Sequence, residues 1–203
     1  MDLRQAAPWA RAAGATGMAA NALLVGFYAL EAGRRPRRIS LGSANDLVGS
    51  LGTALMLPVA VAVSPDRWTR RLGLISMTVL TIAGPALVAG FVTFRRQLPV
   101  ALAGFAGLSG WVVLTSRAHR GVLPGPVTRL GFRSGGAVLA GGCTAAAGML
   151  FPAGSTGRQV ALAAAGVSGS TGMLALPLWF LRLGAAAAEV TPATERQPET
   201  GRR

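Results

Sequence analysis

The sequence contains no lysine, one cysteine (Cys143) and one histidine (His119), and its 203 residues include only seven aspartates and glutamates. A single cysteine excludes an intramolecular disulfide, and a single histidine cannot supply the ligand set of a zinc site. No P-loop, H-E-x-x-H, C-x-x-C or aspartate-rich prenyl-transfer motif occurs in the chain. We therefore predict no cofactor, no metal site and no catalytic set.

Charged residues are also missing from six long stretches, each 19 to 24 residues in length. An α-helix needs about 20 apolar residues to cross roughly 30 Å of hydrocarbon, so each stretch is long enough to span a bilayer. The sequence predicts an all-α fold, a polytopic transmembrane bundle of six helices with short loops, over residues 1–183. The composition of residues 184–203 predicts a disordered polar tail. The six charge-free stretches are 12–30, 47–65, 72–94, 97–116, 134–157 and 159–181.

All 20 basic residues are arginine, and the formal net charge is +13. Such a charge can indicate a nucleic-acid partner, but nucleic-acid domains gather their basic residues on one surface among aromatic side chains. Here the arginines lie at the ends of the charge-free stretches, where they anchor helices and contact anionic headgroups. We expect the partner to be a bilayer with anionic lipids and not a nucleic acid.

An even number of crossings places both termini on one side of the membrane. The loops on that side hold ten arginines and those on the opposite side hold seven, so the positive-inside rule favours cytoplasmic termini in a multi-pass protein of the plasma membrane. The first helix alone favours the reverse, because two arginines precede it and four follow it. All four tryptophans fall toward the terminal side, which predicts a one-sided interfacial belt of Trp9, Trp68, Trp111 and Trp179.

Three polar residues form the candidate polar or transport site. Asp46 follows Asn45 at the start of the second stretch, and an ionisable group at membrane depth is a functional candidate by default. The alternative is structural, because Ser43 and Asp46 have the spacing of a capping box and four arginines upstream offer an ion pair. Asn21 lies inside the first stretch, where its amide is expected to bond to a neighbouring helix.

Prolines and small residues predict where the helices bend and pack. Pro58, Pro85 and Pro177 each remove a backbone hydrogen bond, so they are candidate helix hinges around a cavity. Small residues four positions apart recur in the second, fifth and sixth stretches, which predicts that these helices form the packed centre. The same faces could instead join copies of the chain or bind a membrane partner subunit.

The string Gly-Leu-Ser-Gly at 107–110 resembles the serine motif that rhomboid intramembrane proteases carry in a six-helix core. Such an enzyme needs a histidine base on another helix within reach of the serine. The lone histidine, His119, follows Ser109 by ten residues in the next loop, and the string recurs at 166–169 around Ser168. We therefore predict that the chain is not an intramembrane hydrolase.

The segments 43–50 (SANDLVGS) and 175–179 (ALPLW) resemble those of small six-helix actinobacterial membrane proteins of unknown function. This resemblance implies the membrane topology and carries no activity with it. Two hypotheses follow for function. The first is a non-enzymatic membrane component that packs against itself or a partner. The second is a small transporter or lipid-handling protein that uses Asp46 and the proline-kinked helices around a central cavity.

Overall fold

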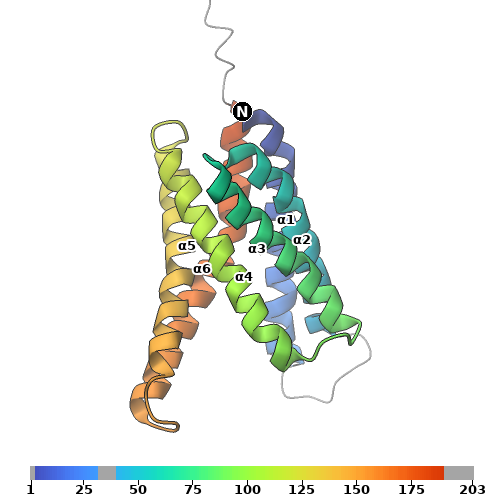
Figure 1. Cartoon of the computed structure of the whole chain (residues 1–203). Coiled ribbons are helices and arrows are strands. Elements are labelled where there is room, and N and C mark those ends of the chain that lie inside the picture. Colours follow the sequence, from blue (N-terminus) through green and yellow to red (C-terminus); the bar gives the residue numbers. More distant parts are fainter. Residues whose placement is uncertain (1–2, 32–39, 190–203) are drawn as a thin grey trace, which may run out of the picture.

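The computed structural model describes residues 3–31 and 40–189 as a bundle of long helices that run up and down (Figure 1). The predicted all-α fold with six helices is confirmed. Five of the six, all except α5, are long and apolar enough to cross a membrane. The helices are α1 (Leu3–Leu30), α2 (Leu41–Val63), α3 (Arg67–Val88), α4 (Phe94–Ala118), α5 (Gly125–Gly148) and α6 (Thr156–Glu189).

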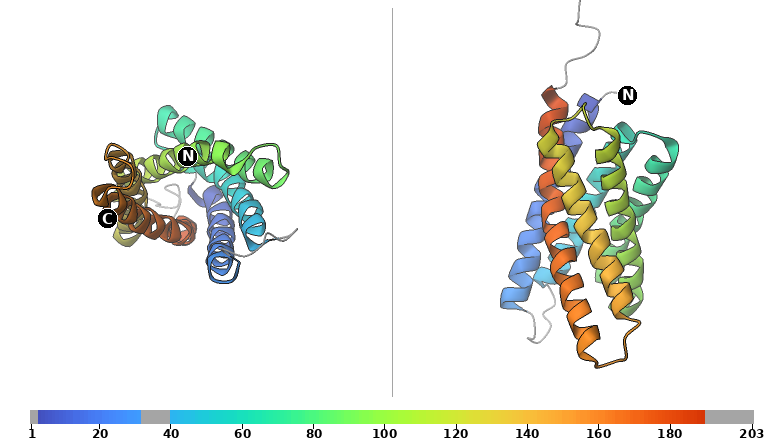
Figure 2. Two further views of the ribbon diagram at one scale, coloured as in Figure 1. Left: turned by 90° about the horizontal axis from the view of Figure 1, so that it is seen from below. Right: turned by 90° about the vertical axis from the view of Figure 1, so that its left-hand side faces the viewer.

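The helices form a ring in chain order, which Figure 2 shows from below and from the side. Each helix packs on its neighbours in the sequence, and α6 closes the ring against α1. The predicted centre of helices two, five and six is therefore wrong. The α5–α6 contact is the most extensive, but α2 packs on α1 and α3, because short loops make consecutive helices antiparallel neighbours.

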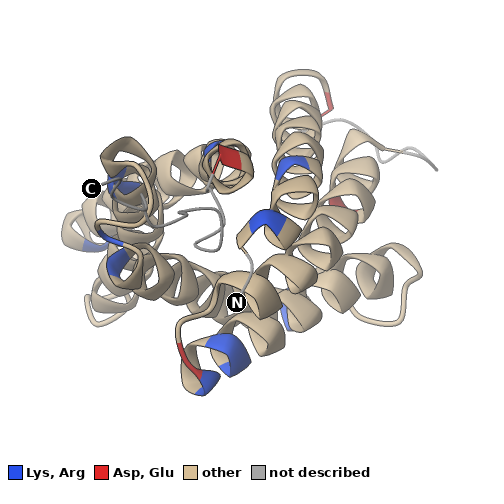
Figure 3. Ribbon diagram, turned by 90° about the horizontal axis from the view of Figure 1, so that it is seen from above, with Lys and Arg blue, Asp and Glu red and all other residues tan. Residues whose placement is uncertain are grey.

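The described ends of the chain lie at one end of the bundle, which we call the terminal end (Figure 1). There the Cα of Gly184 comes so close to α1 that a Cβ would lie 2.8 Å from the carbonyl oxygen of Ala7. Ten arginines of α1, α3, α4, α5 and α6 and their loops belong to this end, all of them exposed. Figure 3 looks onto it, with the basic residues in blue. The opposite end is called the distal end below.

α5 begins earlier than the charge pattern predicts. The gap between the charge-free stretches covers residues 117–133, but the loop is only 119–124, because Pro126 sits in the first turn of α5, where a proline is compatible with a helix. Arg129 and Arg133 therefore lie inside α5, and the helix ends at Gly148 instead of residue 157.

α6 continues beyond the predicted boundary of the membrane domain. A tail from residue 184 was expected, yet residues 184–189 are helical, and Gly184, Ala186 and Ala187 are buried. Small side chains at these positions allow α6 to pack closely on α1, so the predicted boundary is wrong for these residues. The remainder of the predicted tail, 190–203, lies outside the described residues, as do Arg34, Arg35, Arg37 and Arg38.

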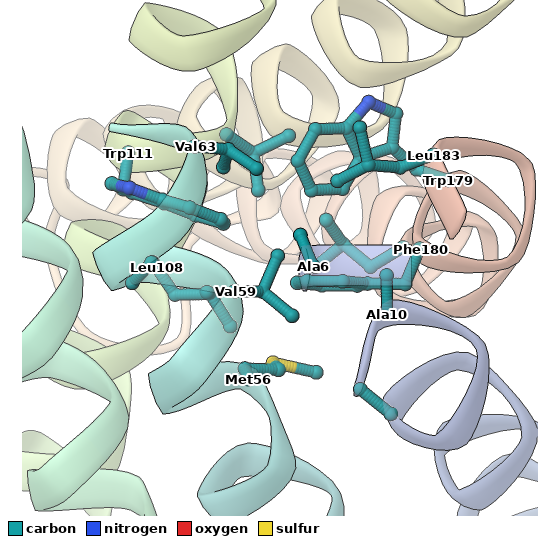
Figure 4. Close-up of a cluster of buried hydrophobic side chains, with 14 of the residues drawn as sticks. Ala6, Ala10, Met56, Val59, Val63, Leu108, Trp111, Trp179, Phe180 and Leu183 are labelled. Carbon is teal, nitrogen blue, oxygen red and sulfur yellow. The ribbon is translucent and has the colours of Figure 1, made fainter. Parts of the chain in front are cut away.

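A cluster of aromatic side chains fills the core toward the terminal end (Figure 4). Trp111 stacks on Phe180 at 6.2 Å between ring centroids, and Trp179 meets Phe180 edge to face at 4.8 Å. The predicted tryptophan belt is therefore wrong for two of its four members, because Trp111 and Trp179 are buried. Trp9 and Trp68 are exposed. Trp111 can leave the interface because its indole N–H donates to Ser64 Oγ at 2.9 Å.

Asp66 caps the start of α3 from outside the membrane-spanning helices. Its Oδ1 accepts hydrogen bonds from the backbone N–H groups of Trp68 at 2.8 Å and Thr69 at 2.9 Å, and its Oδ2 accepts from the Thr69 hydroxyl at 2.7 Å. The bonds from Thr69, backbone and side chain, and then the backbone bond from Trp68 lower the pKa of the Asp66 carboxyl below its ordinary value.

This cap predicts a pH-dependent stability. Because the folded pKa of Asp66 is lowered, its contribution is fully present above the ordinary carboxyl pKa and is lost as the pH falls through the folded pKa. We expect Asp66→Ala to lower the thermal midpoint at neutral pH by a few degrees, with the difference from wild type shrinking in strong acid. Asp66→Asn keeps a capping oxygen and is the control. Equal midpoints of Asp66→Ala and wild type at neutral pH would contradict the assignment.

Candidate functional site

A cavity of about 300 Å³ lies inside the distal half of the bundle. Side chains of α1, α2, α3, α4 and α6 line it, and most of its wall is apolar. The three predicted site residues, Asp46, Asn45 and Asn21, all belong to this wall. The structure thus brings the predicted polar residues together at one cavity. Its polar lining residues are Asn21, Asn45, Asp46, Ser50, Thr53 and Gln97.

Asp46 does not cap α2. The N-cap of α2 is Ser40, whose hydroxyl accepts a hydrogen bond from the backbone N–H of Ser43 at 3.0 Å. Asp46 is therefore the sixth residue of the helix and lies beyond its first turn. The predicted capping box is wrong, because a second serine three residues upstream takes the cap. The arginines predicted to pair with Asp46 lie outside the described residues.

Asp46 is half-buried and forms part of the cavity wall. Among the described residues its carboxylate has no hydrogen bond or ion pair, and Asp46 is the one charged residue that lines the cavity. Gly84 of α3 allows the two helices to approach here, since a Cβ at Gly84 would lie 2.5 Å from the Asp46 carbonyl oxygen. An unpaired carboxylate in a largely apolar membrane cavity is a strong site for a positive charge.

Two side-chain amides of the cavity wall, those of Asn21 and Gln97, donate hydrogen bonds to neighbouring helices. Asn21 Nδ2 donates to the carbonyl oxygen of Leu174 on α6 at 3.3 Å, which confirms the predicted bond from Asn21 to a neighbouring helix. Gln97 Nε2 of α4 donates to the carbonyl oxygen of Ala83 on α3 at 3.2 Å. Sequence reasoning did not single out Gln97, although it is a polar residue at the start of a charge-free stretch. These bonds join the helices around the cavity.

The two hydroxyl groups of the cavity are also engaged. Ser50 Oγ donates to the carbonyl oxygen of Leu80 at 3.4 Å, and Thr53 Oγ1 donates to the carbonyl oxygen of Ser50 at 2.9 Å. Thr53 Oγ1 also lies 3.1 Å from the hydroxyl of Thr81 on α3. The α2–α3 side of the cavity is therefore held by polar contacts between the helices.

The three predicted hinge prolines are placed differently. Pro177 is buried in α6 and lines the cavity, where its ring packs against Gly17 of α1. Its missing N–H frees the carbonyl group of Met173, another lining residue. Pro58 and Pro85 lie in α2 and α3 but not in the cavity wall, and Pro85 is exposed. The hinge role of all three stays a prediction.

The cavity is closed toward the terminal end by the aromatic cluster. Met56 and Leu108 belong both to the cavity wall and to the core that contains Trp111 and Phe180. Beyond them, buried polar atoms without a hydrogen-bond partner among the described residues are found in α4 and α6. They are Ser109 Oγ, Thr115 Oγ1, Ser116 Oγ and Trp179 Nε1.

Ser109 has no base beside it in the described part of the chain. Its hydroxyl is fully buried and unpartnered. His119 lies ten residues further along, about 15 Å by helical rise, and its Nδ1 is 3.0 Å from the carbonyl oxygen of Thr115. Residues 3–31 and 40–189 also contain no group of three acidic, histidine or cysteine residues that could hold a metal ion.

Comparison with known proteins adds no assignment to this geometry. The chain matches no protein-family profile, no curated protein and no solved structure. The resemblance to small actinobacterial membrane proteins therefore stays a prediction.

Proposed function

We propose that the protein is a small, non-enzymatic transporter or lipid-handling protein of the plasma membrane that binds an amphipathic small molecule in the cavity at Asp46. The observation that carries this proposal is the convergence of Asp46, Asn45 and Asn21 on one largely apolar cavity. Ionisable residues inside membrane bundles are costly and mark substrate or ion pathways. The volume of about 300 Å³ lies at the lower end of the range for small-molecule pockets.

The composition of the wall supports access from the bilayer. Among the described residues α5 contributes none to the lining, whereas α4 and α6 on either side of it do. Figure 1 shows α5 and α6 diverging from α1–α4 toward the distal end. Leu98 and Phe105 of α4 and Met173 of α6 are apolar lining residues of this side. A lipid-soluble molecule that enters on this side, where α5 does not contribute to the cavity wall, would stay in an apolar environment.

A cavity-filling variant tests this proposal. Gly49 lines the cavity, and no atom lies within 4 Å of the position of its missing Cβ, so Gly49→Leu is expected to reduce the cavity volume without a clash at the Cβ. We expect native mass spectrometry of the wild-type chain in mild detergent to show co-purifying small amphipathic molecules that are lost from Gly49→Leu. Gly142→Leu, at an exposed position of α5 that is equally open, is the matched control. Identical bound molecules in Gly49→Leu and wild type would contradict the proposal.

A second candidate function is that of a membrane component that packs against itself or a partner subunit. Gly136, Gly142 and Gly166 of α5 and α6 have no atom within 4 Å of the position of a Cβ, so another helix could approach closely there. Purification in mild detergent with a mass measurement separates the candidates. A stable complex supports this second function, and a monomer that co-purifies with no other protein contradicts it.

For orientation, we propose that both termini are cytoplasmic. The exposed arginines of the terminal end support this arrangement through the positive-inside rule. Reporter fusions at each terminus test it: a cytoplasmically active reporter is expected to work at both ends. A reporter that is active only after export would contradict the orientation.

A further inference from the structure

The cavity presents more hydrogen-bond acceptors than donors to a ligand. Asn21 and Gln97 each use one of two amide N–H groups on a backbone carbonyl group of a neighbouring helix, which leaves each side chain one N–H and a carbonyl oxygen with two acceptor positions. The hydroxyl protons of Ser50 and Thr53 are likewise used on backbone carbonyl groups. Asn45 has no such bond among the described residues, so its amide can both donate and accept. A ligand that donates hydrogen bonds therefore fits this lining better than one that accepts them.

The charge of the lining favours a positively charged ligand. Asp46 is its one charged residue in the described chain, and its carboxylate has no ion-pair partner there. Arg95 and Arg96 precede Gln97 in the sequence, but both are exposed and neither lines the cavity. A carboxylate with both oxygens available accepts strong, charge-assisted hydrogen bonds from an ammonium group. An anionic ligand would instead meet like charge in a low-dielectric setting.

The rest of the wall is apolar. Met56, Leu80, Phe105, Leu108 and Leu176 lie around the same cavity as Asp46. This combination matches a molecule with a positive head and an apolar body. We propose that the ligand of the cavity is a protonated amine with an apolar tail, and that Asp46 is its counter-ion. The inference rests on the proposed function, because it names the ligand class of the same cavity.

Three probes of equal chain length test the ligand class: hexylammonium, hexan-1-ol and hexanoate. Binding to the full-length chain is measured by calorimetry in an uncharged maltoside detergent. We expect wild type to bind hexylammonium most tightly. Asp46→Asn should weaken hexylammonium binding by about tenfold or more, as expected for a lost charged hydrogen bond. Its binding of hexan-1-ol should be unchanged.

Two further variants keep the test decisive. Asp66→Asn removes a carboxylate at the start of α3, outside the cavity, and should leave the binding of all three probes unchanged. Asp46→Glu retains the charge and should retain the preference for hexylammonium, which covers the case in which Asp46→Asn fails to fold. Circular dichroism and the thermal midpoint report folding of each variant.

The outcomes separate the inference from the proposed function. Equal binding of the three probes to wild type, tighter binding of hexanoate, or unchanged hexylammonium binding by folded Asp46→Asn overturns the amine assignment. The cavity would still be a binding site in those cases, provided that Gly49→Leu abolishes binding of the probe that binds. Failure of wild type to bind any probe, together with the same co-purifying molecules in wild type and Gly49→Leu, overturns both.

Discussion

Gly172→Ala is expected to lower the free energy of unfolding by about 1–3 kcal/mol, the usual cost of overpacking a close contact. A Cβ at this position of α6 would lie 2.6 Å from the carbonyl oxygen of Ser134 and 2.8 Å from the backbone nitrogen of Val138 on α5. Because both atoms belong to backbone, no side-chain rotation relieves the clash, and the two helices must separate. Unfolding in mixed micelles of sodium dodecyl sulfate measures the effect.

Gly166→Ala is the matched control, because it makes the same change six residues away in the same helix. No atom lies within 4 Å of a Cβ at Gly166. Alanine also has the higher helix propensity, so this variant should be neutral or slightly more stable than wild type. If the two variants are equally stable, the close α5–α6 contact at Gly172 is not the feature that holds this pair together.

The second large effect concerns the aromatic cluster. Trp111→Ala is expected to cost about 3–5 kcal/mol in the free energy of unfolding, because it removes a fully buried indole and leaves a cavity. The lost contacts are those with Trp179, at 5.8 Å between ring centroids, and with Phe180. A cost similar to that of replacing the exposed Trp68 by alanine would show that Trp111 is not a packing centre.

The hydrogen bond of Trp111 can be measured separately from its packing. Trp111 Nε1 donates to Ser64 Oγ at 2.9 Å, so Ser64→Ala leaves a buried N–H without its acceptor and should cost about 1–3 kcal/mol. In a Trp111→Phe background the donor is absent, and the same Ser64→Ala change should cost less. Equal costs in the two backgrounds would show that the bond does not stabilise the fold.

The membrane bundle could be predicted because the absence of charge is visible in the sequence itself, one stretch at a time. The helix ends were less predictable, since they depend on competing local signals. Ser40 and Ser43 are both able to cap α2, and the structure uses Ser40. Proline usually interrupts a helix, but Pro126 lies in the first turn, where it is tolerated, so α5 begins at Gly125.

Position around the helix axis was beyond reach of the sequence. Trp111 and Trp179 were correctly placed near the terminal end, but sequence does not show that they face inward. The sequence also does not show that Asn21 and Asp46 line the same cavity, because this depends on the rotation of α1 and α2 about their axes. Gln97 was missed as a lining residue for this reason. The sequence shows that it lies at the start of a membrane stretch, but not which side of α4 its side chain occupies.

The length of α6 makes the arrangement of the helices sensitive to the thickness of the bilayer. Its charge-free part, residues 159–181, spans about 35 Å, somewhat more than a hydrocarbon layer of roughly 30 Å. Tilting is the usual response of an overlong helix to such hydrophobic mismatch, and a thinner membrane demands more of it. Toward the distal end α6 diverges from α1–α4 (Figure 1), and its residues Met173, Leu176 and Pro177 line the cavity. We therefore expect a thin bilayer to tilt the α5–α6 pair outward and a thick one to draw it in, so that membrane thickness changes the width of the cavity.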